Sequence, residues 1–147
     1  MPDKPHSVLF CCTSNAIRSP MAEAITKRFY GQQIFVDSAG VSRGMLHPLA
    51  VEAMDEIGAD LSKHRPKTFD DLEDTSFDLV ISLTPQAQHR AMELTRYMAC
   101  EVEFWNTFDP SLVEGSRETQ LEAFRAVRDE LQRRILARFG APKAPVL

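Results

Sequence analysis

Short apolar runs alternate with longer stretches of helical periodicity along this chain of 147 residues. Four runs have the composition of β-strands, at residues 8–12, 33–37, 77–83 and 101–105. The first and third runs are almost continuously apolar, which is typical of strands buried on both faces. The fourth run alternates polar and apolar residues, which indicates an edge strand.

Helical patterns fill most of the sequence between and after these runs. They start at about Ser19 and cover residues 48–57, 84–95 and 118–139. Gly58 and Gly140 are natural stops for the second and the last of these helices. The rest reads as irregular loops at 41–48, 62–67 and 107–110, a short acidic helical turn at 70–74, and a disordered tail from about residue 141.

Strands that alternate with helices predict a parallel sheet with right-handed crossovers. We therefore expect an α/β fold in which helices flank a four-stranded parallel sheet. No internal repeat or linker interrupts the pattern, so residues 1–147 should form one domain. Ligands of such sheets bind outside the carboxyl ends of the strands, where the strand order reverses. The segment that leaves the first strand, residues 12–18, is therefore the first place to look for a site.

The chemistry of this segment fits an anion site. Cys12 opens the loop and Arg18 closes it, with turn-forming and small residues between them: Thr13, Ser14, Asn15, Ala16 and Ile17. Loop N–H groups and the first N–H groups of the following helix can converge on a tetrahedral anion. The same positive field stabilises a thiolate, and the arginine fork can hold two phosphate oxygens. Cys12 would then lie beneath the anion as a nucleophile.

Two plainer interpretations of these residues stand beside this one. A cysteine that ends an apolar strand is most often a small buried hydrophobic residue, and an arginine six residues later is often surface charge. The loop also differs from the glycine-rich phosphate-binding loop of nucleoside triphosphatases, because the sequence has no G-x-x-x-x-G-K-[ST].

Composition and charge exclude several classes of partner. The net charge of −4 and pI near 5.6 argue against a nucleic-acid partner. No apolar run is long enough to span a membrane, and the N-terminus has no signal-peptide core. Three cysteines, two of them adjacent, give neither a disulfide framework nor a C-x-x-C pair for zinc. These features predict a reduced, cytoplasmic protein.

With these residues identified, the chain resembles the low-molecular-weight protein tyrosine phosphatase family and its arsenate reductase branch. The matching segments span most of the chain up to Pro110 and occur in the family's order: V-L-F-C-C-T-S-N-A-I-R-S-P-M-A-E, V-D-S-A-G, I-G-A-D-L-S-K-H-R, F-D-L-V-I-S-L and W-N-T-F-D-P. The resemblance implies a flavodoxin-like fold with four parallel strands, in agreement with the strands predicted above.

The resemblance also implies roles for individual residues. Cys12 matches the nucleophile that forms a phosphocysteine intermediate, and Arg18 matches the residue that clamps the equatorial oxygens. Asp109 matches the general acid for the leaving oxygen, and Ser19 matches a hydroxyl that hydrogen-bonds the thiolate. The loop would be held in shape by Asn15, Ser38 and His64. No metal and no cofactor is implied, because loop amides and Arg18 supply the positive charge.

The supporting residues have plainer interpretations too. Asp-Pro is a common turn dipeptide, Ser38 before Ala-Gly would more often be turn chemistry, and His64 between two cations would usually be solvated. The other histidines, His6, His47 and His89, are expected on the surface.

The sequence departs from the family in three ways. The aromatic walls of the phosphatases are missing: Ser111 and Leu112 follow Asp-Pro, and the loop at 41–48 has no aromatic residue. Met45, Leu46 and Leu112 are the candidates for an apolar wall instead. Thr84 and Ala91 lie near the places where thioredoxin-coupled arsenate reductases carry two further cysteines. Ile17 stands where many family phosphatases have a second loop cysteine. We expect both Cys11 and Cys100 to be buried instead.

Three hypotheses follow for the function. The first is a cysteine-dependent phosphatase of phosphomonoesters, either phosphotyrosine in proteins or a small phosphate ester. The second is an arsenate reductase that uses an external thiol such as glutathione, mycothiol or glutaredoxin, because only Cys12 would then be needed. The third is a non-catalytic anion-binding module that retains the loop for phosphate, sulfate or arsenate.

Overall fold

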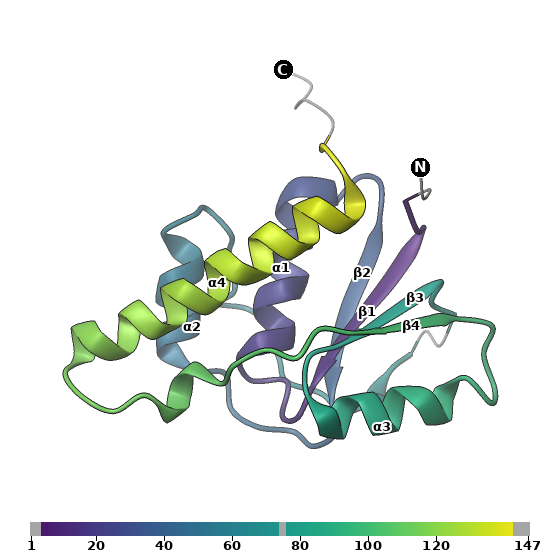
Figure 1. Ribbon diagram of the computed structural model, residues 1–147, viewed down its shortest axis with the longest axis horizontal. Helices are drawn as coiled ribbons and strands as arrows, with labels where there is room; N and C mark the ends of the chain where they lie inside the picture. Colours follow the sequence, from purple (N-terminus) through teal and green to yellow (C-terminus); the bar gives the residue numbers. More distant parts are fainter. Residues whose placement is uncertain (1–3, 74–75, 143–147) are drawn as a thin grey trace.

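The computed structural model describes residues 4–73 and 76–142, and its centre is a sheet of four parallel strands in the order β2-β1-β3-β4 (Figure 1). The strands are β1 (Ser7–Cys12), β2 (Phe35–Gly40), β3 (Leu79–Ser82) and β4 (Glu101–Phe104). This confirms the predicted fold class, with apolar β1 and β3 at the centre and β4 at an edge.

Helices cover both faces of this sheet (Figure 1). Val8, Phe10 and Cys12 of β1 face a large core formed with α1 (Arg18–Tyr30), α2 (Pro48–Asp55) and α4 (Arg117–Phe139). Leu9 and Cys11 face the opposite side, where α3 (Pro85–Leu94) covers a smaller core. The alternation of side chains along a strand therefore places the two adjacent cysteines on different faces.

Several predicted boundaries shift by a few residues. The second strand runs through Ser38 and Gly40, which the sequence had indicated as a loop, because these residues pair with the end of β1. Helix α2 ends at Asp55 and is followed by a turn to Gly58. The acidic turn is the short helix η1 (Phe69–Asp71), and a second one, η2 (Pro110–Leu112), follows Asp109. Residue 74 and most of the predicted disordered tail lie outside the described residues.

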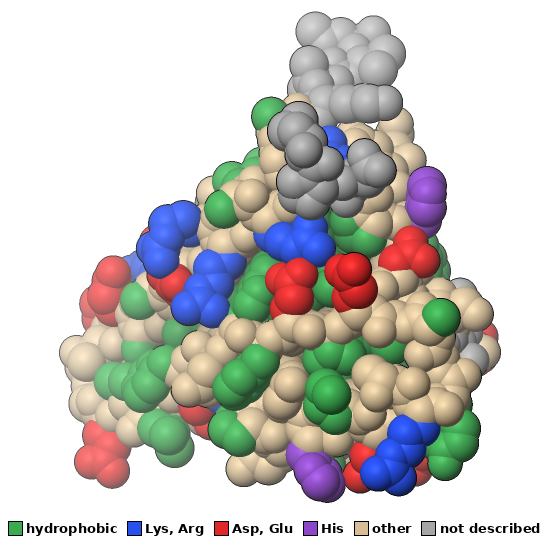
Figure 2. Space-filling model, turned by 45° about the vertical axis from the view of Figure 1, so that its right-hand side comes forward, with side chains coloured by type: hydrophobic (Ala, Val, Ile, Leu, Met, Phe, Trp, Pro, Cys, Tyr) green, Lys and Arg blue, Asp and Glu red, His purple; other side chains and the backbone are tan. Residues whose placement is uncertain are grey.

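Two observations concern the membrane span and the nucleic-acid partner that the sequence argues against. Within the described ranges, none of the helices is both long and apolar enough to cross a bilayer. On the face shown in Figure 2, basic and acidic side chains are interspersed and form no basic patch.

Candidate functional site

The loop from Cys12 to Arg18 lies where β1 ends, at the point where the strand order reverses. Its carbonyl groups turn outward to the segment that follows β2. Val41, Ser42, Gly44 and His47 donate backbone N–H groups to the carbonyls of Cys12, Thr13, Ser14 and Ala16, at 2.8–3.2 Å. Because the carbonyls are bound on the outside, the loop N–H groups are left to face the centre.

The start of α1 adds further free donors to this centre. Its N-cap residue, Ile17, makes no side-chain cap, so the first N–H groups of the helix are not taken by a capping oxygen. In the part of the chain that the structure describes, the backbone N–H groups of residues 13–17 make no hydrogen bond to a backbone carbonyl of the turns, loops and caps. Free loop and helix N–H groups around one point form a cradle for a tetrahedral anion.

Cys12 lies at the floor of this cradle with little exposed surface (2%). Its Sγ is 2.9 Å from the Ser19 Oγ, so the predicted contact between thiol and hydroxyl is present in the structure. Cys11, by contrast, is buried in the opposite core, as expected, and burial raises its pKa well above the usual value. Of the two adjacent thiols, only Cys12 borders the cradle.

Asn15 holds the loop in a conformation that few residues adopt. Its φ is +54°, in the left-handed region, and its side chain is fully buried. The amide nitrogen donates to the Ser19 and Ser38 hydroxyls at 2.9 Å, and the amide oxygen accepts from the Lys67 N–H at 2.9 Å. Asparagine tolerates this conformation better than most side chains, and here every polar atom of its amide is used.

His64 completes this support from the far side of Asn15. Its Nε2 is 3.0 Å from the Asn15 Oδ1, and burial lowers its pKa although Glu23 opposes the shift. The side chain is only 8% exposed and is therefore buried, and not solvated as its charged neighbours in the sequence would suggest.

Glu23 is a member of this network that the sequence reasoning missed. The Ser38 hydroxyl donates to the Glu23 Oε1 at 2.5 Å, and Lys27 forms an ion pair with the other oxygen. Acidic residues are common near the start of a helix, so the sequence did not indicate that Glu23 is buried in this network. Glu23 is also four residues before Lys27, a spacing at which ion pairs are common on helix surfaces.

Arg18 and Asp109 face each other across the mouth of the cradle. The Arg18 Nη1 donates to the Thr107 carbonyl at 2.9 Å, and its Nη2 is 4.0 Å from the Asp109 Oδ2. Asp109 also caps η2 by accepting from the Ser111 N–H at 2.9 Å. The structure thus brings the cysteine, arginine and aspartate of the sequence prediction to one place.

Exposed apolar side chains lie on the two segments beside the cradle. Met45, Phe108 and Leu112 are 88%, 59% and 70% exposed, whereas Leu46 packs against the core. Of the three wall residues named from the sequence, Met45 and Leu112 are therefore exposed, and their contact with a bound substrate stays a prediction. Phe108, which comes before Asp109, lines a separate hollow with Ala123, Ala126 and Val127 of α4.

The end of β2 approaches the loop so closely that residue 40 has no room for a side chain. A Cβ at residue 40 would lie 2.6 Å from the Ser42 carbonyl oxygen and 2.7 Å from the Asn15 nitrogen. Both are backbone atoms, which cannot move without deforming the cradle.

We therefore expect Gly40→Ala to weaken phosphate binding by at least about tenfold and to lower the free energy of unfolding by ~1–3 kcal/mol. Gly140→Ala is the control, since Gly140, unlike Gly40, has a positive φ, and nothing lies within 4 Å of an added Cβ there. The control should lose stability with phosphate affinity unchanged, as measured by calorimetric titration. Equal phosphate affinity in both variants would contradict this account of the cradle.

Neither of the other two thiols of the described chain lies beside that of Cys12. Cys11 faces the opposite core, and Cys100, which was expected to be buried, is only partly buried at the other end of the strands. Cys100 immediately precedes β4, whose first residue, Glu101, is in register with Leu79 and Val8. Cys12 is the last residue of β1, at the other end of the strands. Along the strand direction it lies ~16 Å from Cys100, five residues at 3.3 Å each.

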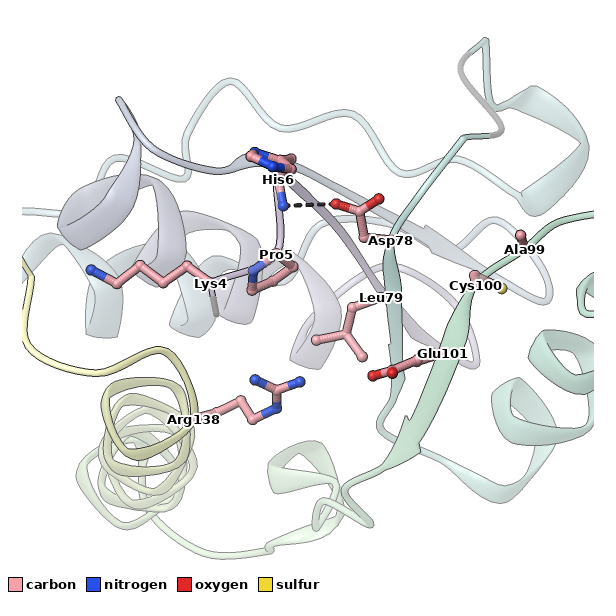
Figure 3. A pocket seen from close by; sticks show the side chains of 9 residues that line it. All are labelled: Lys4, Pro5, His6, Asp78, Leu79, Ala99, Cys100, Glu101 and Arg138. Atoms are coloured by element: carbon pink, nitrogen blue, oxygen red, sulfur yellow. Dashed lines mark hydrogen bonds between the residues drawn. The ribbon is translucent and has the colours of Figure 1, made fainter. Parts of the chain in front are cut away.

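Cys100 lines a hollow of about 590 Å³ together with residues that include Lys4, Asp78, Glu101 and Arg138. Figure 3 shows how the side chains around this hollow lie.

The two residues near the places where thioredoxin-coupled arsenate reductases carry further cysteines are also not thiols. Thr84 is buried, caps α3, and accepts a hydrogen bond from the Thr13 hydroxyl at 3.2 Å, while Ala91 packs in the smaller core. Within the described residues, no cluster of three or more His, Cys, Asp or Glu side chains is arranged to hold a metal ion. The cradle therefore has one thiol, one guanidinium and one carboxyl as its reactive groups.

Comparisons with known proteins agree with this fold. The arsenate reductase of Halalkalibacterium halodurans is 37% identical over 128 residues, which cover 87% of this chain and 91% of that protein. The glutaredoxin arsenate reductase of Synechocystis is 32% identical over 129 residues, or 87% of this chain and 92% of that protein. A structure of the YwlE arginine phosphatase with a phosphorylated active-site serine superposes with a TM-score of 0.67 at 28% identity, covering 90% of this chain and 93% of that one.

The family profile for low molecular weight phosphotyrosine protein phosphatases matches residues 7–139, which include all four strands, the cradle and Asp109. The chain therefore belongs to the low molecular weight phosphotyrosine protein phosphatase family, as its sequence motifs predicted.

Proposed function

We propose that this protein reduces arsenate with an external thiol, through a covalent adduct on Cys12. The observation that carries the proposal is a single thiol beneath an anion cradle, with no second thiol beside it in the described chain. The names of the curated relatives support arsenate as the oxyanion, and the glutaredoxin-named relative supports an external thiol. These names favour arsenate over phosphotyrosine, which was the first hypothesis from the sequence.

The first step forms the adduct. The Cys12 thiolate attacks arsenic and forms an S–As bond, while an arsenate oxygen leaves as water with a proton from Asp109. Arg18 would exchange its bond to the Thr107 carbonyl for two arsenate oxygens and stabilise their charge in the transition state. Ser19, 2.9 Å from the sulfur, stabilises the thiolate as a hydrogen-bond donor.

The second step reduces arsenic. An external thiolate attacks the Cys12 sulfur and forms a mixed disulfide, and the electron pair of the S–As bond passes to arsenic, which leaves as arsenite. A second external thiol then attacks the mixed disulfide, which returns the Cys12 thiolate and releases the external disulfide. In total, two thiols are oxidised to one disulfide and one As(V) is reduced to As(III).

Hydrolysis of phosphate monoesters is the second candidate. Asp109, 4.0 Å from Arg18, would protonate an ester oxygen and then take a proton from water, so this reaction would need no thiol besides Cys12. The similarity to the YwlE arginine phosphatase supports a phosphoryl substrate. The exposed side chains of Met45 and Leu112 would contact an apolar leaving group. A cytoplasmic location stays a prediction for either candidate.

One experiment separates these candidates from each other and from a non-catalytic module. The purified protein is incubated with arsenate and with p-nitrophenyl phosphate, each with and without glutathione and glutaredoxin, and arsenite and phosphate are measured. Thiol-dependent arsenite release supports reduction, and phosphate release without thiol supports hydrolysis. Cys12→Ser should abolish either activity and Cys100→Ser should retain it. Oxyanion binding with no product from either substrate would overturn both candidates.

A further inference from the structure

The hollow that Phe108 lines lies between the segment after β4 and one side of α4. Its volume is about 360 Å³. The segment contributes residues 106–108, and α4 contributes Ala123, Ala126 and Val127 together with Glu130 and Arg134. These α4 residues recur at spacings of three or four, which places them on one side of the helix. A hollow of this size with mostly apolar walls and a few polar groups has the character of a small-molecule site.

The walls of this hollow leave apolar surface in contact with water. Phe108 is 59% exposed although it is a large aromatic residue, and Ala126 is exposed on α4. Neither side chain belongs to the two hydrophobic cores of the described chain. An apolar ligand between them would remove this surface from water, which favours binding.

Arg134 adds hydrogen-bond donors to the α4 wall of the hollow. Its Nε donates to the Glu130 Oε1 at 2.9 Å, and its two terminal nitrogens make no hydrogen bond with another of the described residues. Glu130 also pairs with Arg133, so two guanidinium groups share one carboxylate. One positive charge is therefore left without a partner here, and it complements an anionic ligand.

We propose that this hollow is a binding site for a small carboxylate with an apolar body, such as an aromatic or branched aliphatic acid. The apolar body would pack between Phe108 and the alanines of α4. The carboxylate would accept hydrogen bonds from the terminal nitrogens of Arg134, whose planar fork matches its two oxygens. An inorganic anion would make only the second of these contacts, and a neutral apolar molecule only the first.

This hollow shares Thr107 with the cradle. The Thr107 N–H donates to the Leu83 carbonyl at 2.9 Å, its hydroxyl donates to the Trp105 carbonyl at 2.7 Å, and its own carbonyl accepts from Arg18. A ligand that fits the hollow in this arrangement would stabilise the state in which Arg18 is bound to Thr107. An oxyanion in the cradle needs Arg18 released, so the two ligands should weaken each other's binding by the same factor. This coupling rests on the proposed function of the cradle, whereas binding in the hollow does not.

Calorimetric titration with 3-phenylpropanoate tests the site, and the fluorescence of Trp105, the one tryptophan of the sequence, gives a second readout. The probe should bind with a Kd below about 10 mM. Two matched compounds, 3-phenylpropanamide without the charge and propanoate without the ring, should bind at least about tenfold more weakly. A probe Kd above that limit would overturn the site. Equal affinity for the acid and the amide would indicate a neutral occupant, such as a side chain of another protein, and would overturn the assignment to a carboxylate.

Variants of α4 locate the bound probe. Arg134→Met keeps an apolar stem and should weaken binding by about tenfold or more, whereas Arg133→Met removes a more exposed arginine of the same cluster and should not. Ala126→Leu should fill the hollow and abolish binding. Ala137→Leu, an exposed alanine of α4 outside the hollow, is its control. All four replacements are good helix formers, so α4 should be retained. Wild-type affinity in Arg134→Met and Ala126→Leu would overturn the site.

Titration of phosphate with and without the probe tests the coupling. The probe should raise the Kd of phosphate about fivefold or more, and the rise should level off as the hollow saturates. A rise without limit would show competition within the cradle and would overturn the hollow as the site of the carboxylate. An unchanged Kd of phosphate at saturating probe would overturn the coupling. Absence of phosphate binding by a wild-type protein that binds the probe would instead overturn the proposed function and support the hollow as a separate site.

Discussion

Replacing Cys12 by serine is expected to abolish turnover while leaving the cradle able to bind an oxyanion. The serine hydroxyl has no general base beside it, so it is a far weaker nucleophile than a thiolate. The neighbouring groups, the loop N–H donors and Arg18, remain in place. We expect kcat to fall by about 10⁴-fold or more, the scale on which removal of a nucleophile acts.

The measurement is product release under single-turnover conditions, together with calorimetric titration of phosphate. Cys100→Ser is the matched control because Cys100 lies at the amino end of β4, whereas Cys12 lies at the carboxyl end of β1, and it should retain full activity. Turnover by Cys12→Ser above one hundredth of the wild-type rate would exclude Cys12 as the nucleophile.

Replacing Arg18 by lysine should have the second-largest effect. Lysine keeps the charge but loses the planar fork that can bind two anion oxygens and the Thr107 carbonyl. Loss of one such preorganised donor group costs about 10²–10³ in kcat. The fall in kcat should exceed the rise in KM, since the clamp is strongest in the transition state.

Steady-state kinetics of Arg18→Lys against Arg43→Lys test this prediction. Arg43 lies on the neighbouring loop, but it is exposed and pairs with Asp71. Its conservative replacement should change kcat less than about twofold. Equal effects of the two replacements would show that Arg18 acts only through its charge.

The sequence predicted those parts of the structure that local patterns determine. The apolar runs predicted four parallel strands, and the motifs predicted the family, because both signals lie within short segments such as the one from Val8 to Met21. Cys12, Ser19 and Arg18 share one strand, loop and helix start. Their mutual placement follows from that local geometry alone.

The sequence was less informative where distant segments meet. Glu23 reaches Ser38, and His64 reaches Asn15, across large gaps in sequence, so no local pattern indicates either contact. His47 appeared to be a surface histidine because its burial comes from Phe124, on another helix. The end of β2 was assigned to a loop because Ser38 and Gly40 are weak strand formers, whereas pairing with β1 decides the structure there.

The preference for arsenate does not follow from the residues of the cradle. The residues of the cradle fit phosphate and arsenate equally, because both are tetrahedral oxyanions. The curated relatives shifted the balance towards arsenate. The single-domain organisation, the roles of the individual site residues and the choice between the two substrates stay predictions.

A crystal structure with bound vanadate, an analogue of the transition state of such transfers, tests the central claim most directly. The claim is that the Cys12 sulfur attacks an oxyanion held by loop N–H groups and Arg18. The account predicts vanadium bonded to the Cys12 Sγ, its equatorial oxygens on the N–H groups of residues 13–18, and the Arg18 fork turned from the Thr107 carbonyl to those oxygens. Vanadate bound elsewhere, with Arg18 still on Thr107 and a free Cys12 sulfur, would contradict it.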